Sequence, residues 1–206
     1  MANVMKSARD DAPALYMRAM DGAVAIVSAI RPDQWHNATP CAEWDLRVLV
    51  NHVTGENLWI EQILGGKTIA DVGTSLDGDL LGDDPIKAYV DSVARAKASL
   101  LPERYDLHYG VSLGDISGYD YLSQMFMDQL VHSWDIAKGS GQNAVFDDAL
   151  VVAATPIAEE MVGYVGPGSV FGTRVTTDTG ASSLDVLLGV LGRKGDWKPP
   201  TGATFV

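Results

Sequence analysis

The spacing of apolar residues along the chain predicts four long helices. Residues 10–30 carry apolar side chains three or four positions apart, which is the repeat of an amphipathic helix, at Leu15, Ala19, Ala23, Ile26 and Ile30. The same repeat recurs over residues 45–64, 85–101 and 119–138. Four amphipathic helices of this length, following one another along the chain, predict an all-α fold in which they pack as a bundle.

Residues with strong preferences for helix ends mark the boundaries of these helices. Asp45 stands at the N-cap position of the second helix, and Gly65-Gly66 follow its last apolar residue. Pro85 suits the first turn of the third helix, which should stop before Pro102. Gly139-Ser-Gly141 should end the fourth helix.

The two connections between the later helices differ in character. Residues 65–84 are rich in glycine and aspartate and predict a long loop. Residues 105–109 alternate as a short strand does, and Gly114-Asp-Ile-Ser-Gly118 is typical of a turn. We therefore expect a small hairpin or extended flap before the fourth helix, with His108 on the surface of a strand.

The C-terminal region is expected to decorate the bundle. A further apolar-periodic segment runs over residues 147–165, where Pro156 should kink or restart it. Residues 165–181 are rich in glycine and threonine and should be extended, and a last helix is predicted at about 183–193. We expect a single domain over residues 1–206, with the bundle core at about 10–138 and a C-terminal extension at about 145–206.

The charge balance and the cysteine content restrict the functional classes. Acidic residues number 27 against 15 basic ones, and the formal net charge of −12 repels phosphate backbones and anionic lipid. We therefore expect neither nucleic-acid nor membrane partners. Cys41 is the only cysteine, which excludes an internal disulfide and fits a reducing compartment. We interpret it as a small packing residue. The N-terminal residues lack the apolar core of a secretory signal, so the expected location is the cytoplasm.

A carboxylate and a histidine four residues apart form the main candidate site. In a helix over 119–138, Asp128 and His132 lie one turn apart and project from one face. Their neighbours are apolar, and a buried carboxylate or imidazole is costly unless something pairs with it. A divalent metal bound by Asp128, His132 and the distant His52 would satisfy all three. Two histidines and one carboxylate leave coordination positions open, which is typical of a catalytic metal site.

Zinc suits imidazole and carboxylate donors best, although Fe2+, Ni2+ and Mn2+ accept the same ligands. His52 has a structural alternative, a hydrogen bond to a core group. Glu56, one turn after His52, is a candidate base, and a solvated or hydrogen-bonded glutamate is an equal alternative. Asp135 either supports a ligand histidine or pairs with an arginine at the end of the bundle, and we favour the arginine pair. Trp134 is expected to pack in the core.

Four motifs give the chain a resemblance to a known family. They are Thr39-Pro-Cys-Ala-Glu-Trp-Asp-Leu-Arg47, Asn51-His-Val53, Asp128-x-x-x-His132-Ser-Trp-Asp-Ile-Ala137 and Leu187-Leu-Gly-Val-Leu-Gly-Arg193. Together they resemble the DinB/YfiT-like metal-binding superfamily, and within it the actinobacterial branch related to the N-terminal domain of mycothiol-dependent maleylpyruvate isomerase. The resemblance implies a DinB/YfiT-like four-helix bundle whose metal ligands are His52, Asp128 and His132.

The activity implied by the resemblance is a transferase or isomerase reaction that depends on mycothiol. The metal would activate the thiol as a thiolate, which would attack a small electrophilic substrate, with Glu56 as a base. The isomerase has a full second domain that this chain lacks, so maleylpyruvate itself is not the expected substrate. Two alternatives remain open: a hydrolase or lyase that uses metal-bound water, and a non-catalytic bundle that binds a metal or small ligand. The resemblance is also compatible with a homodimer.

Overall fold

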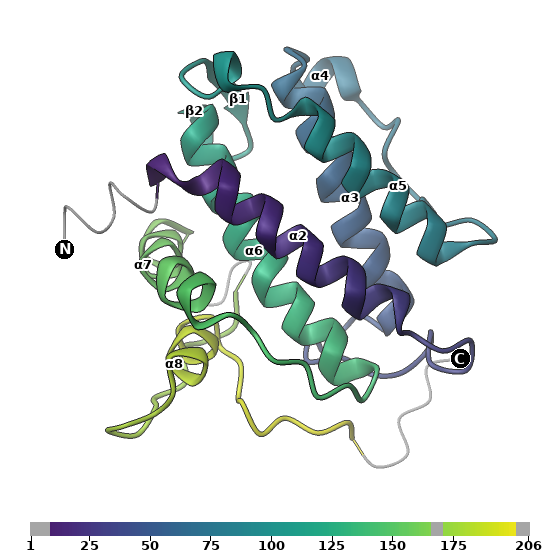
Figure 1. Ribbon diagram of the computed structural model, residues 1–206, viewed down its shortest axis with the longest axis vertical. Coiled ribbons are helices and arrows are strands. Elements are labelled where there is room, and N and C mark those ends of the chain that lie inside the picture. The colour runs from purple at the N-terminus through teal and green to yellow at the C-terminus, as the bar shows by residue number, and fades with distance from the viewer. Residues whose placement is uncertain (1–8, 166–170, 201–206) are drawn as a thin grey trace.

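Four helices form the bundle that the apolar spacing predicts (Figure 1). They are α2 (Ala12–Ser28), α3 (Leu46–Leu64), α5 (Pro85–Ser99) and α6 (Gly118–Gly139). α2 packs along α6 and α5, and α3 packs along the same two helices on the other side. Each helix therefore has two neighbours around a shared core, which confirms the all-α bundle. The computed structural model describes residues 9–165 and 171–200.

Side-chain caps explain where three bundle helices begin. The Asp45 carboxylate accepts a hydrogen bond from the backbone N–H of Val48 at 2.8 Å, as the N-cap position requires. Asp84 caps α5 in the same way, with Pro85 in the first turn. Ser117 caps α6 through the N–H of Asp120. α3 ends at Gly65, as predicted.

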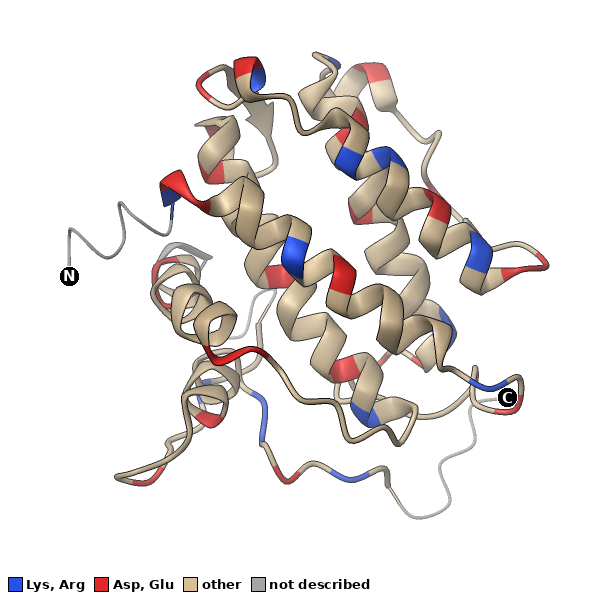
Figure 2. Ribbon diagram, viewed as in Figure 1, with Lys and Arg blue, Asp and Glu red and all other residues tan. Residues whose placement is uncertain are grey.

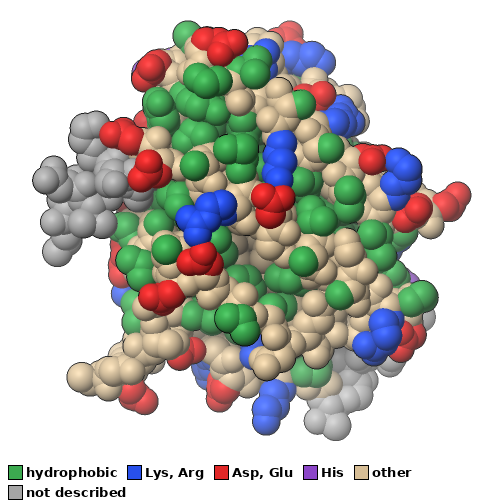
Figure 3. All heavy atoms as spheres, viewed as in Figure 1, with side chains coloured by type: hydrophobic (Ala, Val, Ile, Leu, Met, Phe, Trp, Pro, Cys, Tyr) green, Lys and Arg blue, Asp and Glu red, His purple; other side chains and the backbone are tan. Residues whose placement is uncertain are grey.

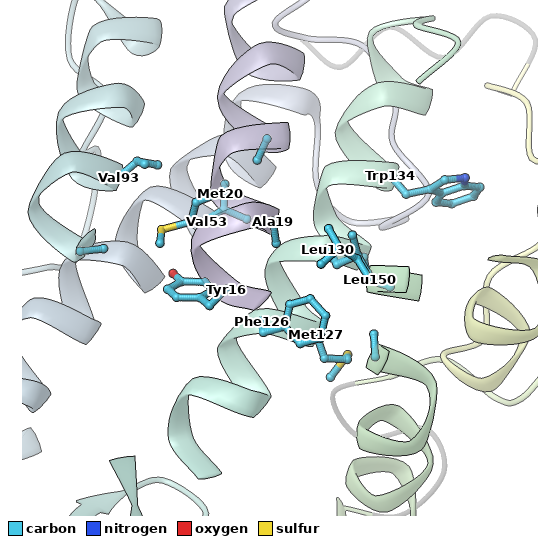
Figure 4. Close-up of a cluster of buried hydrophobic side chains, with 14 of the residues drawn as sticks. Tyr16, Ala19, Met20, Val53, Val93, Phe126, Met127, Leu130, Trp134 and Leu150 are labelled. Carbon is cyan, nitrogen blue, oxygen red and sulfur yellow. The ribbon is translucent and has the colours of Figure 1, made fainter. Parts of the chain in front are cut away.

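Apolar side chains from all four bundle helices meet in one core (Figure 4). Tyr16 and Met20 of α2 lie beside Val53 of α3 and Phe126 of α6, and all four are at most 1% exposed. A buried line of polar groups runs through this core: the Tyr16 hydroxyl donates to Asn57 Oδ1 at 2.7 Å, and Asn57 Nδ2 donates to Ser92 Oγ at 3.1 Å. These bonds join α2, α3 and α5, because buried polar groups require partners.

Two connections differ from the expected pattern. The segment predicted as a loop over 65–84 contains a short helix, α4 (Ile69–Val72), which begins at a reciprocal capping pair between Thr68 and Asp71. The predicted hairpin is present as β1 (His108–Val111) and β2 (Gly114–Ser117), paired antiparallel. Gly114 to Ser117 is a strand rather than the predicted turn, since the chain reverses before it, at Ser112 and Leu113.

The C-terminal region packs on the outer side of α6 (Figure 1). α7 (Asp148–Val165) continues through Pro156, so the predicted restart there is wrong. The carbonyl that Pro156 leaves without a partner belongs to Val152, which is exposed, so water can satisfy it. α8 (Ser183–Val190) packs on α7 and ends three residues before the predicted boundary at 193. Part of the predicted extended segment, 166–170, lies outside the described residues, and residues 171–178 form neither helix nor strand.

Figure 2 shows that acidic and basic residues are spread along the helices and loops and are not confined to one element. On the face shown in Figure 3, acidic and basic groups lie among apolar ones and do not gather into one patch. Arg18 of α2 and Asp147, just before α7, form an exposed ion pair at 2.5 Å, which water screens and which therefore adds little stability. Within the described residues, no helix is both long enough and apolar enough to span a membrane.

Candidate metal centre

The three residues predicted as ligands lie together between α3 and α6. Nε2 of His132 is 3.4 Å from Oδ1 of Asp128, and Nε2 of His52 is 3.8 Å from Oδ2 of the same carboxylate. The ligand atoms of all three lie within 4.8 Å of one another. Four ligands held at 2.0–2.2 Å around a tetrahedral zinc ion stand about 3.4 Å apart. The donor set therefore fits a divalent metal in both chemistry and spacing.

Local electrostatics already favour a cation beside Asp128. Burial alone would raise the pKa of the Asp128 carboxyl, but the charge and hydrogen bond of His132, followed by those of His52, hold this pKa well below its usual range. Burial alone would lower the pKa of His132, and Asp128 together with Asp135 raises it well above the ordinary value. A buried carboxylate that stays ionised beside an imidazole in this way can also hold a metal ion.

Asp135 supports His132 and pairs with an arginine at the same time. Its Oδ2 lies 3.0 Å from Nδ1 of His132 and accepts a hydrogen bond from Arg193 Nη2 at 2.7 Å. Asp135 is fully buried. Burial would raise the pKa of its carboxyl, but the Arg193 charge and the bond with His132 lower this pKa overall. The arginine pair that the sequence favoured is therefore present, and the same carboxylate also contacts the candidate ligand His132.

Cys41 and Trp44 are site residues that the sequence reasoning missed. The Trp44 ring lies over His52, with centroids 4.8 Å apart. Cys41 Sγ is 3.4 Å from Asp135 Oδ2 and 3.9 Å from His132 Nδ1. Both belong to the Thr39–Arg47 motif, which carried the family resemblance without indicating that its turn faces the site. The interpretation of Cys41 as packing alone therefore omitted its polar neighbours.

The turn that carries Cys41 is held in place by close contact between residues 37–39 and the end of α6. The backbone of Ala38 and Thr39 passes over the end of α6 at Gly139, where a side-chain Cβ would lie 3.0 Å from the Thr39 methyl group and 3.2 Å from the Ala38 oxygen. Asn37 Nδ2 donates to the Gly139 carbonyl at 3.0 Å. Glycine at this position lets the turn that carries Cys41 approach α6, on which Asp128 and His132 lie.

A second group of ligand-type side chains shares His132. Cys41, His132 and Asp135 also have ligand atoms within 4.8 Å of one another. The guanidinium of Arg193 already occupies this side, because it donates to Asp135 and lies 3.7 Å from the sulfur of Cys41. A cation there would face the fixed positive charge of Arg193. The group with His52 and Asp128, on the Nε2 side of His132, is therefore the better metal site.

Glu56 lies next to the ligand group. Its Oε1 is 4.0 Å from Nδ1 of His52, and its side chain is 31% exposed. Burial, followed by the charge of Asp128, raises the pKa of the Glu56 carboxyl to about 7, against the opposing effect of His52 and His132. His108, by contrast, lies on β1 with its side chain 63% exposed, beside Asp115, as the surface interpretation predicts.

The ligand group opens into a pocket of about 880 Å³. Walls come from α3, α6, the hairpin turn, the Pro40–Trp44 turn and the C-terminal segment. Most of the lining is apolar or aromatic and includes Trp59, Met125, Phe171 and Leu191. A pocket of this size and composition, with a few converging polar groups at one wall, is typical of a small-molecule site.

Comparison with known proteins places this geometry in context. Residues 16–137 match the sequence model of a family described as the mycothiol maleylpyruvate isomerase N-terminal domain. Two proteins of Mycobacterium tuberculosis, from strains CDC 1551 / Oshkosh and ATCC 25618 / H37Rv, are each 29% identical to the chain over 181 residues, covering 86% of this chain and 95% of their own length. Both bear the name of uncharacterized proteins. No solved structure matches the chain significantly.

Proposed function

Since the chain belongs to the family of the mycothiol maleylpyruvate isomerase N-terminal domain, a DinB-like domain, we propose that it is a metal-dependent enzyme using a thiol cosubstrate. The reaction would be a transfer or isomerisation on a small electrophilic organic molecule, with mycothiol as the thiol. The observation that carries the proposal is the convergence of His52, Asp128 and His132 on one wall of a large apolar pocket.

His52, Asp128 and His132 would hold one divalent ion, with zinc preferred over Fe2+, Ni2+ or Mn2+ for this donor set. Three protein ligands leave a coordination position open toward the pocket. When bound, the ion would supply Lewis-acid activation and lower the pKa of a thiol that reaches it. Asp128 is shorter than glutamate by one methylene, so it would hold the ion nearer to α6 than a glutamate at this position would.

Glu56 is the proposed base. It lies on the pocket wall one helical turn from His52, where its carboxylate could take the proton from an incoming thiol. In an addition, a sulfur–carbon bond forms at the electrophilic carbon and the proton held by Glu56 passes to the neighbouring carbon. In the adduct the former double bond is a single bond, about which the molecule can rotate. Loss of the proton to Glu56 and of the thiolate then restores the double bond in the other geometry, without any net redox change.

The pocket favours a substrate whose body is uncharged. Arg193 is the only arginine or lysine among the described lining residues, and each of its three guanidinium nitrogens already donates a hydrogen bond within the protein. No free guanidinium remains there to clamp a substrate carboxylate. Trp44, Trp59 and Met125 instead offer apolar and aromatic contacts. We therefore propose an uncharged electrophile rather than a dicarboxylate such as maleylpyruvate.

The domain organisation, cellular location and partners of the protein are also proposals. We propose that residues 1–206 act as one domain on a small molecule in the cytoplasm, where low-molecular-weight thiols are kept reduced. The net charge of −12 argues against nucleic-acid or membrane partners. A homodimer rests on the family resemblance alone.

The test is turnover of an uncharged electrophile, 1-chloro-2,4-dinitrobenzene, by zinc-loaded protein. We expect release of chloride and formation of the thioether with mycothiol, loss of this activity after chelation, and loss in His132→Ala. Hydrolysis of an activated ester without thiol would instead favour the hydrolase alternative. Stoichiometric zinc without turnover of either substrate would contradict the enzymatic proposal and leave a metal-binding bundle.

A further inference from the structure

A buried chain of three side chains connects the C-terminal segment to the candidate metal centre. Arg193 donates to Asp135 through Nη2 at 2.7 Å and through Nε at 3.2 and 3.3 Å, and Asp135 contacts His132 Nδ1 at 3.0 Å. The Arg193 side chain is 11% exposed and that of Asp135 is 0% exposed. An ion pair this well shielded from water is costly to leave unpaired.

The contact with Asp135 decides which nitrogen of His132 faces the pocket. A carboxylate is only an acceptor, so the hydrogen between it and His132 must lie on Nδ1. In neutral imidazole the lone pair is then on Nε2, which is the atom that faces Asp128 at 3.4 Å. This is the arrangement in which a carboxylate orients a metal-binding histidine.

Asp135 can play this part because Arg193 balances its charge. The guanidinium donates to both carboxylate oxygens of Asp135, from Nε to Oδ1 and from Nη2 to Oδ2, and this pair of hydrogen bonds fixes the orientation in which Oδ2 meets Nδ1 of His132. The guanidinium therefore acts on the metal ligand through Asp135.

The chain backbone fixes Arg193 in this position. Gly192 has a φ of 80° and packs so closely on Gly172 that a Cβ there would lie 2.5 Å from a backbone atom. The N–H of Arg193 donates to the Leu188 carbonyl at 2.8 Å, and its Nη1 donates to the Leu191 carbonyl at 3.0 Å. These contacts hold the arginine at the end of α8, outside the segment 16–137 that matches the family.

We propose that Arg193 is a positioning residue of the metal centre, so that docking of residues 171–193 and metal binding at His132 stabilise each other. The inference rests on the proposed role of His132 as a ligand. Linkage requires the effect to be reciprocal: a metal on Nε2 strengthens the hold of the C-terminal segment, and loss of that hold weakens the metal.

Zinc affinity, measured by competition with a chromophoric chelator, tests whether metal binding depends on Arg193 and Asp135. We expect Arg193→Gln and Asp135→Asn to weaken zinc binding about 10- to 100-fold, the usual effect of removing such a partner. Arg193→Lys should recover part of the loss, because it keeps the charge without the fork of donors. Arg18→Gln removes an exposed ion pair elsewhere and should leave the affinity unchanged. The visible spectrum of the cobalt-substituted protein should change in Arg193→Gln, because the His132 ring is less firmly oriented.

Hydrogen exchange in the unmodified protein tests whether zinc stabilises the C-terminal segment, and it needs no variant. Zinc should slow amide exchange in residues 183–193 more than in α5, which contributes no ligand. Unchanged zinc affinity and an unchanged cobalt spectrum in Arg193→Gln, or equal effects of zinc on both segments, would overturn the coupling while leaving the metal centre intact. Failure of the unmodified protein to bind zinc at all would instead overturn the metal centre itself, and this inference with it.

Discussion

The carboxylate of Asp128 and the Nε2 atom of His132 lie 3.4 Å apart, one turn from each other on α6. His52 lies on a different helix, α3, so the spacing of residues along α6 cannot by itself bring it close to Asp128 and His132. The packing of α3 on α6 therefore brings the three candidate ligands together.

Metal content should depend on each of these three residues. Protein purified without added metal or an affinity tag should carry about one equivalent of zinc or another transition metal by elemental analysis. His52→Ala and His132→Ala should each lose it. His108→Ala is the matched control, because its exposed side chain lies on β1, away from the pocket, and it should retain the metal. Equal metal in all four proteins would contradict the site.

Glu56→Gln should separate chemistry from metal binding. If Glu56 moves the thiol proton, the amide should lower kcat about 100-fold, within the range for general-base catalysis. Metal content should stay at the unmodified level, since Glu56 is not a proposed ligand. Glu61→Gln, on the same helix and paired with Arg95, serves as the control. A loss of metal in Glu56→Gln would reassign this residue to the ligand group.

Removal of the Tyr16 hydroxyl should destabilise the bundle. Tyr16→Phe leaves the buried Oδ1 of Asn57 without its 2.7 Å donor, which should cost about 1–2 kcal/mol in the free energy of unfolding. Urea denaturation followed by circular dichroism measures this change. Tyr119→Phe, at a partly exposed position in the first turn of α6, should cost less. Equal effects would argue against a role of the polar line in stability.

Gly192→Ala should disturb the C-terminal wall more than a comparable change elsewhere. Gly192 and Gly66 both have positive φ, at 80° and 92°, but only at Gly192 would a Cβ meet other backbone. We expect a loss of more than about 2 kcal/mol for Gly192→Ala and about 1 kcal/mol for Gly66→Ala. Thermal unfolding of both variants checks the difference, and similar melting temperatures would contradict the close contact with Gly172.

The Arg47–Asp79 pair gives a prediction for pH. Hydrogen bonds from Arg47, and then from the N–H of Leu81, lower the pKa of the Asp79 carboxyl below its ordinary value of 3.8. Because the folded-state pKa is depressed, the small stabilisation from this pair is present above pH 3.8 and is lost as the pH falls through the folded-state pKa. Carboxyl NMR should show a titration midpoint below 3.8 for Asp79, moving upward in Arg47→Gln and staying in place in Arg95→Gln.

Much of this fold follows from local pattern. Periodic apolar residues and the cap at Asp45 located the bundle helices, because both signals act within a few residues of one another. The short helix at Ile69–Val72 was missed, since a glycine-rich composition hides the capping pair of Thr68 with Asp71. Pro156 was expected to kink or restart its segment, and α7 runs through it without a restart; exposure of Val152 lets the helix tolerate the proline.

The site was predictable only in part. The spacing of Asp128 and His132 is a local signal, and the resemblance supplied His52. Arg193 and Cys41 reach Asp135 from positions 58 and 94 residues away along the chain, and no periodicity reports contacts at that range. Asp135 showed the limit most clearly, because the sequence offered its two partners as alternatives and the folded chain uses both.

The walls of the pocket come from two parts of the chain, one inside the family-matched segment and one outside it. The ligand group lies within the segment 16–137, whereas Phe171, Leu191 and Arg193 come from beyond it. Replacement of Phe171 or Leu191 can therefore alter which molecules enter without touching a metal-binding side chain. Under the proposed function, changes at Phe171 or Leu191 would alter substrate selection and leave the three proposed ligands in place, whereas a change at Arg193 would reach His132 through Asp135.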